Sequence, residues 1–146
     1  MIPKFRAWLP TLKWMCNVSA ILFDVKSLDV YKMGDTERVT EMSVNQDEVT
    51  LMQSTGLFDK NGTEIFEGDI IDTTDYEGGL SSVGNPFVKI ERDKYGFIVT
   101  GDFPDSPITI KEFEAGRKFA GVEVTIVGNI YENSELIKEV REIDGN

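Results

Sequence analysis

Apolar and polar residues alternate in short runs along most of the chain, with the period of two that is typical of half-buried β-strands. In the clearest run, Val122, Val124 and Ile126 share one face, and Val127 begins a stretch that we expect to be more fully buried. Many short strands with turn residues between them predict a mainly β fold, built of small barrel-like β modules with short hairpins. The predicted strands are residues 4–8, 13–18, 19–25, 28–33, 38–44, 48–53, 68–73, 86–92, 96–101, 108–113 and 122–131.

The first predicted strand, residues 4–8, has the sequence KFRAW. We expect Phe5, Ala7 and Trp8 to point inward. The Leu9-Pro10-Thr11 segment that follows is typical of a turn, so the strand should form a hairpin with residues 13–18.

The C-terminal segment has the one clear helical pattern of the sequence. Asn133-Ser134 is a good N-cap pair, and an acidic residue follows in the first turn. Apolar residues then recur at helical spacing, so we predict one short amphipathic C-terminal helix over residues 134–143. The apolar positions are Leu136, Ile137, Val140 and Ile143.

A chain of 146 residues is the size of one ordinary domain. We expect a single domain over residues 1–146, which could divide into two β lobes, about 1–52 and 53–132, with the C-terminal helix 134–143 following them.

Residues 55–71, TGLFDKNGTEIFEGDII, gather several acids and glycines around an Asn-Gly pair. Asn61-Gly62 is a strong signal for a tight hairpin with a type I′ turn, in which both central residues need a positive φ. Glu67-Gly68-Asp69 should form a second turn. We therefore expect Gly62 to matter more for stability than Asp59, which leads into the first turn.

A calcium site is the alternative function for these acids. An EF-hand loop needs acidic ligands at its first and twelfth positions and glycine at the sixth. Aligning Gly62 with the sixth position puts Leu57 at the first and Gly68 at the twelfth. The sequence therefore predicts turns here and no metal-ligating residues.

The composition excludes several kinds of catalysis. The chain contains no histidine and one cysteine, Cys16, so it cannot form a Ser-His-Asp triad, a Cys-His pair or an ordinary zinc site by itself. Cys16 stands among apolar residues and is expected to be buried and inert. Residues 78–86 contain two glycines at P-loop spacing, but the lysine that a P-loop has after the second glycine is missing. We expect residues 76–85 to be a mobile loop. No catalytic, cofactor-binding or metal-binding residue is assigned, and no cofactor is expected.

The chain is acidic, with a formal net charge of −11. Such a charge repels nucleic-acid backbones, so nucleic acid is not expected as a partner. The first 33 residues are basic and the C-terminal segment is acidic, which could steer a basic partner to one end or allow head-to-tail association into a homo-oligomer. The acids of the C-terminal segment are Glu132, Glu135, Glu139, Glu142 and Asp144.

No run of about 18 apolar residues is present, so no membrane span is expected. The start of the chain interrupts its apolar residues with Lys4, Arg6 and Lys13, unlike a signal peptide. Together with the single cysteine, these features favour a reducing cytoplasm.

Three segments, in this order, resemble the YopX family, a family of small proteins of bacteriophages and prophages. They are KFRAW (4–8), LMQSTGLFDKNGTEIFEGDII (51–71) and VGNIYENSEL (127–136), and the resemblance covers most of the chain. It implies a mostly β fold with barrel-like modules and a phage origin. The family has no established biochemical function, so the resemblance implies no site residues.

Three functions remain open from the sequence. The leading hypothesis is a non-enzymatic phage accessory protein that contacts a host or phage protein in the cytoplasm of the bacterial host. The first alternative is a nucleic-acid-binding β-barrel module. It would stack bases on a basic and aromatic platform formed by Lys4, Arg6, Lys13, Trp8 and Trp14. The second alternative is a carboxylate-based hydrolase. It would use a pair of acids from Asp72, Asp75, Glu77, Asp102 and Asp105.

Overall fold

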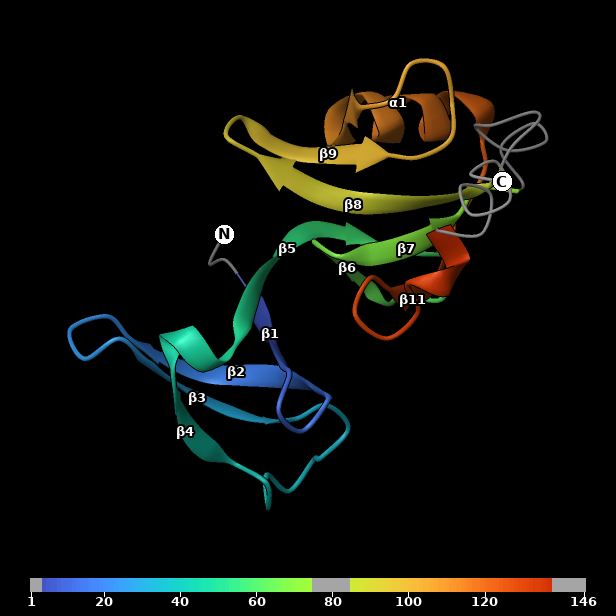
Figure 1. The fold of residues 1–146 in the computed structure, drawn as a ribbon. Coiled ribbons are helices and arrows are strands. Elements are labelled where there is room, and N and C mark those ends of the chain that lie inside the picture. Colours follow the sequence, from blue (N-terminus) through green and yellow to red (C-terminus); the bar gives the residue numbers. More distant parts are fainter. Residues whose placement is uncertain (1–3, 75–84, 138–146) are drawn as a thin grey trace, which may run out of the picture. The chain divides into compact units, whose positions relative to one another are not determined.

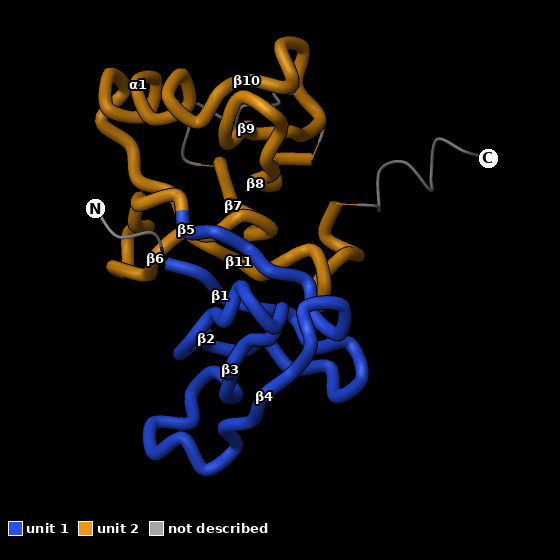
Figure 2. Tube along the Cα trace, turned by 90° about the vertical axis from the view of Figure 1, so that its left-hand side faces the viewer, with its two compact units in different colours: residues 1–54 blue, residues 55–146 orange. Residues whose placement is uncertain are grey.

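The structure is a computed structural model that describes residues 4–74 and 85–137 (Figure 1). The chain divides into two compact units, residues 1–54 and 55–146 (Figure 2). The mainly β fold predicted from the sequence is confirmed. Its strands form two open antiparallel sheets, of order β4-β3-β2-β1-β5-β6 and β10-β9-β8-β7-β11, and the described strands form no closed barrel.

Unit 1 is an antiparallel meander whose last strand returns to pair with the first. The hairpin predicted after residues 4–8 is present: β1 and β2 pair from Leu9 and Trp14 outward, and Lys13 turns the chain with a φ of 56°. The elements are β1 (Phe5–Leu9), β2 (Trp14–Leu22), β3 (Ser27–Lys32), β4 (Met42–Asn45), the 3-10 helix η1 (Gln46–Glu48) and β5 (Thr50–Phe58), which continues into unit 2.

The separate strand predicted at residues 19–25 is wrong. Its first half continues β2, and the turn into β3 follows, with Leu22 paired to Ser27 and Lys26 at a φ of 54°. Phe23 and Val25 lie in this turn and are exposed. Because both residues are apolar, the sequence of the turn resembled a strand.

The core of unit 1 lies on one face of its sheet. Ala7 and Leu9 of β1 are buried in this core, whereas Trp8 lies between them on the other face. Trp8 therefore does not share the core face with Ala7 as predicted, although it is half-buried on the other face, where it pairs with the buried Met15. The buried core residues are Ala7, Leu9, Cys16, Leu28, Val30 and Val44.

Unit 2 is built on the second sheet, with one helix along β9 and β10 (Figure 1). Its elements are the end of β5, β6 (Glu64–Phe66), β7 (Asp69–Asp72), β8 (Phe87–Asp93), β9 (Gly96–Thr100), β10 (Ile108–Thr109), α1 (Ile110–Ala120) and β11 (Thr125–Asn129). Its core consists of Ile65, Ile71, Val88, Ile90, Val99, Phe113 and Val124.

The strand predicted at residues 108–113 is wrong beyond Thr109, where helix α1 begins. The Thr109 side chain accepts a hydrogen bond from the Glu112 N–H, and the Glu112 carboxylate accepts one from the Thr109 N–H. This capping box starts the helix, and Gly121 ends it in the left-handed conformation with a φ of 69°. The local capping chemistry thus outweighs the alternation of Ile108 and Ile110.

The predicted face of Val124, just before β11, and Ile126, within it, packs on the core of unit 2, but Val127 is not buried. The register with β7 shifts between Ile126 and Gly128, so Val127 is the extra residue of a β-bulge and is 38% exposed.

The predicted C-terminal helix is described only at its start, where residues 135–137 are helical. The remainder of that prediction, and the loop predicted to be mobile at residues 76–85 except for Asn85, lie outside the described residues. Within the described part of the chain, no helix is long and apolar enough to cross a membrane.

Candidate interaction surfaces

Asp59 is a buried acid within residues 55–71. Its side chain is 6% exposed. One carboxylate oxygen accepts the N–H groups of Asn61 and Thr63, each at 2.9 Å, and the other accepts the N–H of Ile126 at 3.1 Å. One buried carboxylate therefore holds the hairpin loop closed and ties it to β11, so its lone pairs already serve backbone groups.

The hairpin loop itself differs from the predicted type I′ turn. Gly62 has a φ of 79°, but Asn61 does not have a positive φ. Asp59 and Thr63 close the loop through a 2.9 Å backbone hydrogen bond, and the Gly62 N–H donates to the Asp59 carbonyl. The loop therefore has three residues and ends in a left-handed glycine, the second commonest hairpin type.

The predicted turn at Glu67-Gly68-Asp69 is present between β6 and β7. Asp69 is 2% exposed and accepts the Phe66 N–H at 2.8 Å. Gly68 has a φ of 91°, donates its N–H to the Ile90 carbonyl and accepts the Ile130 N–H. Asp69, like Asp59, therefore stabilises a turn.

Residues 127–136, the last segment of the family resemblance, form a similar polar turn. The Asn129 side chain accepts the N–H groups of Tyr131 and Glu132, and the Asn133 side chain accepts the N–H of Asn129. A Cβ at Gly128 would lie 2.4 Å from the Asn133 side-chain oxygen, so glycine is required there. In both segments, buried polar side chains accept hydrogen bonds from backbone N–H groups and so hold the turns.

The acids proposed for a hydrolase are not brought together where the structure describes them. Asp72 accepts the N–H and hydroxyl of Thr74, and Asp102 accepts the N–H of Asn85 at 3.4 Å. Asp105 lies in the turns of residues 101–107, while Asp75 and Glu77 lie outside the described residues. Within the described ranges no three Cys, Asp or Glu residues are grouped as they would be to hold a metal ion.

Cys16 is fully buried, and burial raises the pKa of its thiol.

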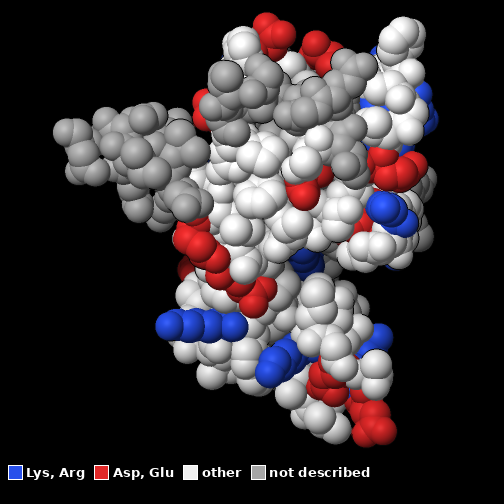
Figure 3. Space-filling model, turned by 90° about the vertical axis from the view of Figure 1, so that its right-hand side faces the viewer, with Lys and Arg blue, Asp and Glu red and all other residues white. Residues whose placement is uncertain are grey.

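The predicted basic and aromatic platform does not form either. Trp14 pairs with Leu9 and packs on the core of unit 1, whereas Trp8 pairs with Met15 on the opposite face of the sheet. Arg6 is buried, and Lys4 and Lys13 are exposed. On the face drawn in Figure 3, basic side chains are separated by acidic and neutral ones. The two tryptophans therefore cannot stack bases side by side.

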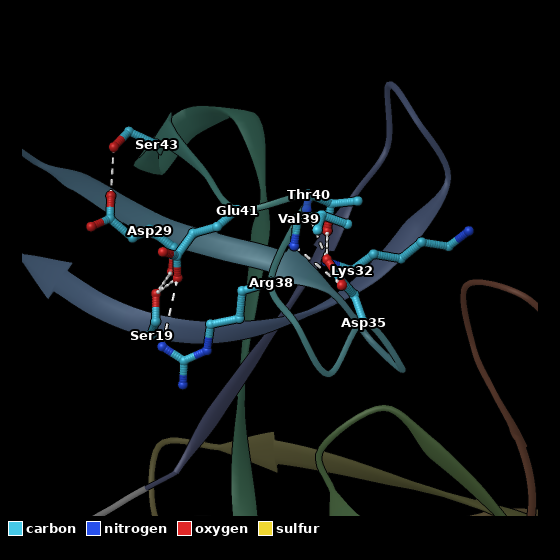
Figure 4. Close-up of polar contacts among 9 residues, drawn as sticks. All are labelled: Ser19, Asp29, Lys32, Asp35, Arg38, Val39, Thr40, Glu41 and Ser43. Atoms are coloured by element: carbon cyan, nitrogen blue, oxygen red, sulfur yellow. Dashed lines mark hydrogen bonds and ion pairs between the residues drawn. The ribbon is translucent and has the colours of Figure 1, made fainter.

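A surface that the sequence did not reveal is the β3–β4 loop, residues 33–41. The strand predicted at residues 38–44 begins only at Met42, because the Asp35 carboxylate accepts the N–H groups of Val39 and Thr40 and holds the chain in a turn (Figure 4). The Thr40 hydroxyl donates to Asp35 at 2.5 Å and accepts the Lys32 N–H at 2.9 Å. The hydrogen bonds from the Thr40 hydroxyl and N–H lower the pKa of Asp35.

This ordered loop presents an apolar side chain beside charged ones. Val39 is 79% exposed. Its neighbour Arg38 has a φ of 57° and lies over the Tyr31 ring, 4.7 Å from its centre. The Arg38 guanidinium is 3.9 Å from the Glu41 carboxylate, which also accepts the Ser19 hydroxyl (Figure 4). Nearby, Asp29 accepts the Ser43 hydroxyl. We use the name loop surface for five residues: Asp29, Tyr31, Arg38, Val39 and Glu41.

The end of α1 is fixed by a charged cluster. Arg117 contacts the Glu114 carboxylate at 2.5 Å and the Glu123 carboxylate at 3.3 Å, and it donates to the Val122 carbonyl. The hydrogen bond from Arg117 lowers the pKa of Glu114, and the same bond raises the pKa of Arg117. The cluster joins the helix to the segment that leads into β11.

We expect Glu114→Gln to remove a pH-dependent part of the stability. Because the pKa of Glu114 is lower in the folded protein, the ion pair stabilises the fold above the ordinary glutamate pKa of about 4.3. This contribution is lost as the pH falls through the folded-state pKa. The melting temperatures of wild type and variant should differ most near neutral pH and converge in acid.

Glu123→Gln is the control, because the Glu123 side chain is 57% exposed and its replacement should have little effect on stability. A constant difference between wild type and Glu114→Gln at every pH would contradict the expectation.

The comparisons with known proteins agree with the resemblance read from the sequence. A family model described as YopX protein matches residues 4–138. The chain therefore belongs to the YopX family. Among solved structures it is similar to the crystal structure of protein EF1440 from Enterococcus faecalis, with 28% sequence identity and a TM-score of 0.59, over 93% of this chain and 98% of that one. The name of that protein states no activity. No curated protein matches the chain.

Proposed function

We propose that this protein is a non-enzymatic accessory protein of a bacteriophage or prophage that acts by protein–protein contact in the cytoplasm of the bacterial host. The observation that carries the proposal is the loop surface of unit 1, in which Asp35 holds Val39 exposed beside Arg38. Ordered loops that present apolar side chains are typical binding elements, because little conformational entropy remains to be lost on binding.

The charge of the loop surface indicates the kind of partner. Asp29 and Glu41 accept hydrogen bonds from serine hydroxyls, which carry no charge. The Arg38 guanidinium, 3.9 Å from Glu41, offsets part of the Glu41 charge, and Asp29 keeps its own. Arg38 is the one basic member. A partner that contacts Val39 with an apolar side chain and approaches these carboxylates with basic groups fits this surface. The polar turns of residues 55–71 and 127–136 support the non-enzymatic part of the proposal. Their side chains Asp59, Asp69, Asn129 and Asn133 accept hydrogen bonds from backbone N–H groups.

Replacing Val39 with aspartate tests the proposal. The tagged full chain is used to capture proteins from a lysate of a bacterium that carries the gene, and the captured proteins are compared by mass spectrometry. We expect Val39→Asp to lose a partner that wild type retains, because a charge replaces the apolar contact. Asp35→Ala should weaken the same capture, because it releases the loop while Val39 stays in place.

Val25→Asp is the matched control, because Val25 is 63% exposed in another turn of the same unit. It should retain the partner. Equal capture by wild type and Val39→Asp, or equal loss with Val25→Asp, would contradict a specific contact at the loop surface.

A further inference from the structure

A groove runs along one flank of α1 in unit 2. Its volume is about 380 Å³, at the low end of the range for ligand pockets. Apolar side chains form much of its wall, among them Leu57 of β5 and Ile110 and Ala115 of α1. The residues that line this α1 groove are Thr55, Leu57, Ile110, Lys111, Glu114, Ala115 and Lys118.

The charges at the α1 groove are unbalanced in favour of lysine. The Glu114 carboxylate is already bound by the Arg117 guanidinium, so this acid does not neutralise the groove. Lys111 and Lys118 are both exposed and lie seven residues apart on one flank of the helix. Seven residues correspond to about 10.5 Å along the axis. The groove therefore offers an apolar wall and two positive charges at a fixed spacing, within a chain of net charge −11.

The chain itself contains a segment of complementary chemistry. Glu135 and Glu142 are also seven residues apart, and the apolar residues Leu136, Val140 and Ile143 recur beside them at helical spacing. In the helix that the sequence predicts over residues 134–143, the two glutamates would have the same spacing as the two lysines. Docking of an amphipathic helix in an apolar groove is a common mode of recognition.

We propose that the α1 groove binds the acidic C-terminal segment, residues 135–146, of a second copy of this chain. Each copy carries one groove and one segment, so two copies can exchange segments reciprocally and close a symmetric dimer. The apolar side chains of the segment enter the groove beside Leu57 and Ile110, while its glutamates pair with Lys111 and Lys118. This proposal does not depend on the loop surface, which belongs to unit 1.

Sedimentation velocity of the full chain over a range of concentrations tests the proposal. We expect a dimer with a dissociation constant on the order of 10 µM, weaker in high salt because the ion pairs are screened. Lys111→Glu/Lys118→Glu should raise the dissociation constant about tenfold or more, because it makes groove and segment repel each other. The control variant Lys60→Glu/Lys94→Glu has the same net charge and should dimerise like wild type.

A charge exchange identifies the two contacting surfaces. Glu135→Lys/Glu142→Lys alone should be as monomeric as Lys111→Glu/Lys118→Glu alone. Mixing the two variants should restore the dimer, because each groove then meets a segment of opposite charge. A wild type that stays monomeric at every concentration, an equal loss in the Lys60/Lys94 control, or a mixture that remains monomeric would each overturn the proposal.

Discussion

Asp59→Ala is expected to lower the free energy of unfolding by about 3 kcal/mol. The substitution removes three hydrogen bonds to a charged acceptor, from the N–H groups of Asn61, Thr63 and Ile126. A hydrogen bond to a charged group contributes about 1.5–3 kcal/mol, and less where water can replace the acceptor, as at the exposed Asn61 and Thr63. Urea unfolding followed by circular dichroism measures the loss. Hydrogen exchange of the Thr63 and Ile126 amides provides a local readout, because both should lose protection.

Gly62→Ala is the comparison variant for this loop. A Cβ at Gly62 meets no atom within 4 Å, so its cost is the left-handed backbone alone, about 1–2 kcal/mol. The structure thus reverses the order expected from the sequence, in which Gly62 mattered more than Asp59. An Asp59→Ala variant as stable as wild type, with Ile126 still protected, would contradict the role assigned to this carboxylate.

Phe113→Ala is expected to destabilise the protein by about 3–5 kcal/mol, the range for deleting a buried aromatic side chain. Phe113 is 2% exposed and is the buried residue of α1, in contact with the core of unit 2. Urea unfolding measured by circular dichroism provides the value.

Phe119→Ala on the same helix is the matched control, because Phe119 is 95% exposed. It should change the stability by no more than about 0.5 kcal/mol. If the two variants lost similar stability, the assignment of Phe113 to the core face of α1 would be wrong.

The hairpins were predictable from the sequence because their signals are local. The Leu9-Pro10-Thr11 segment and the glycines at 62 and 68 mark chain reversals wherever the rest of the protein lies. The turn type after Asp59 was not predictable in the same way. The same Asp59 carboxylate that closes the turn also accepts the N–H of Ile126, 67 residues away in the sequence, and this contact has no local signal.

Helix α1 could have been found from the sequence, because Thr109-x-x-Glu112 is a capping box and Gly121 is a typical helix end. The alternation of Ile108 and Ile110 misdirected the prediction towards a strand. The bulge at Val127 had no such signal, since it follows from the register between β11 and β7.

The candidate surfaces were less accessible to sequence reasoning than the fold. The loop surface depends on Asp35 bonding to residues four and five positions later, so residues 38–41 resembled a strand. The α1 groove requires Leu57 and Ile110 to meet across 53 residues of sequence. The two tryptophans show the opposite: residues that are close in sequence are separated in the structure. Trp8 and Trp14 are near in sequence, but the pleat of the sheet places them on opposite faces.

Asp59 and Asp69 hold the backbone of residues 55–71, and we conclude that this segment forms no metal site. Melting curves of wild type and Asp59→Ala, each recorded with excess calcium and with a chelator, test it most directly. We predict that Asp59→Ala melts well below wild type, and that neither calcium nor chelator shifts either curve. A calcium-dependent rise of several degrees in wild type that disappears in Asp59→Ala would contradict the claim, because a metal bound to the folded state raises its stability.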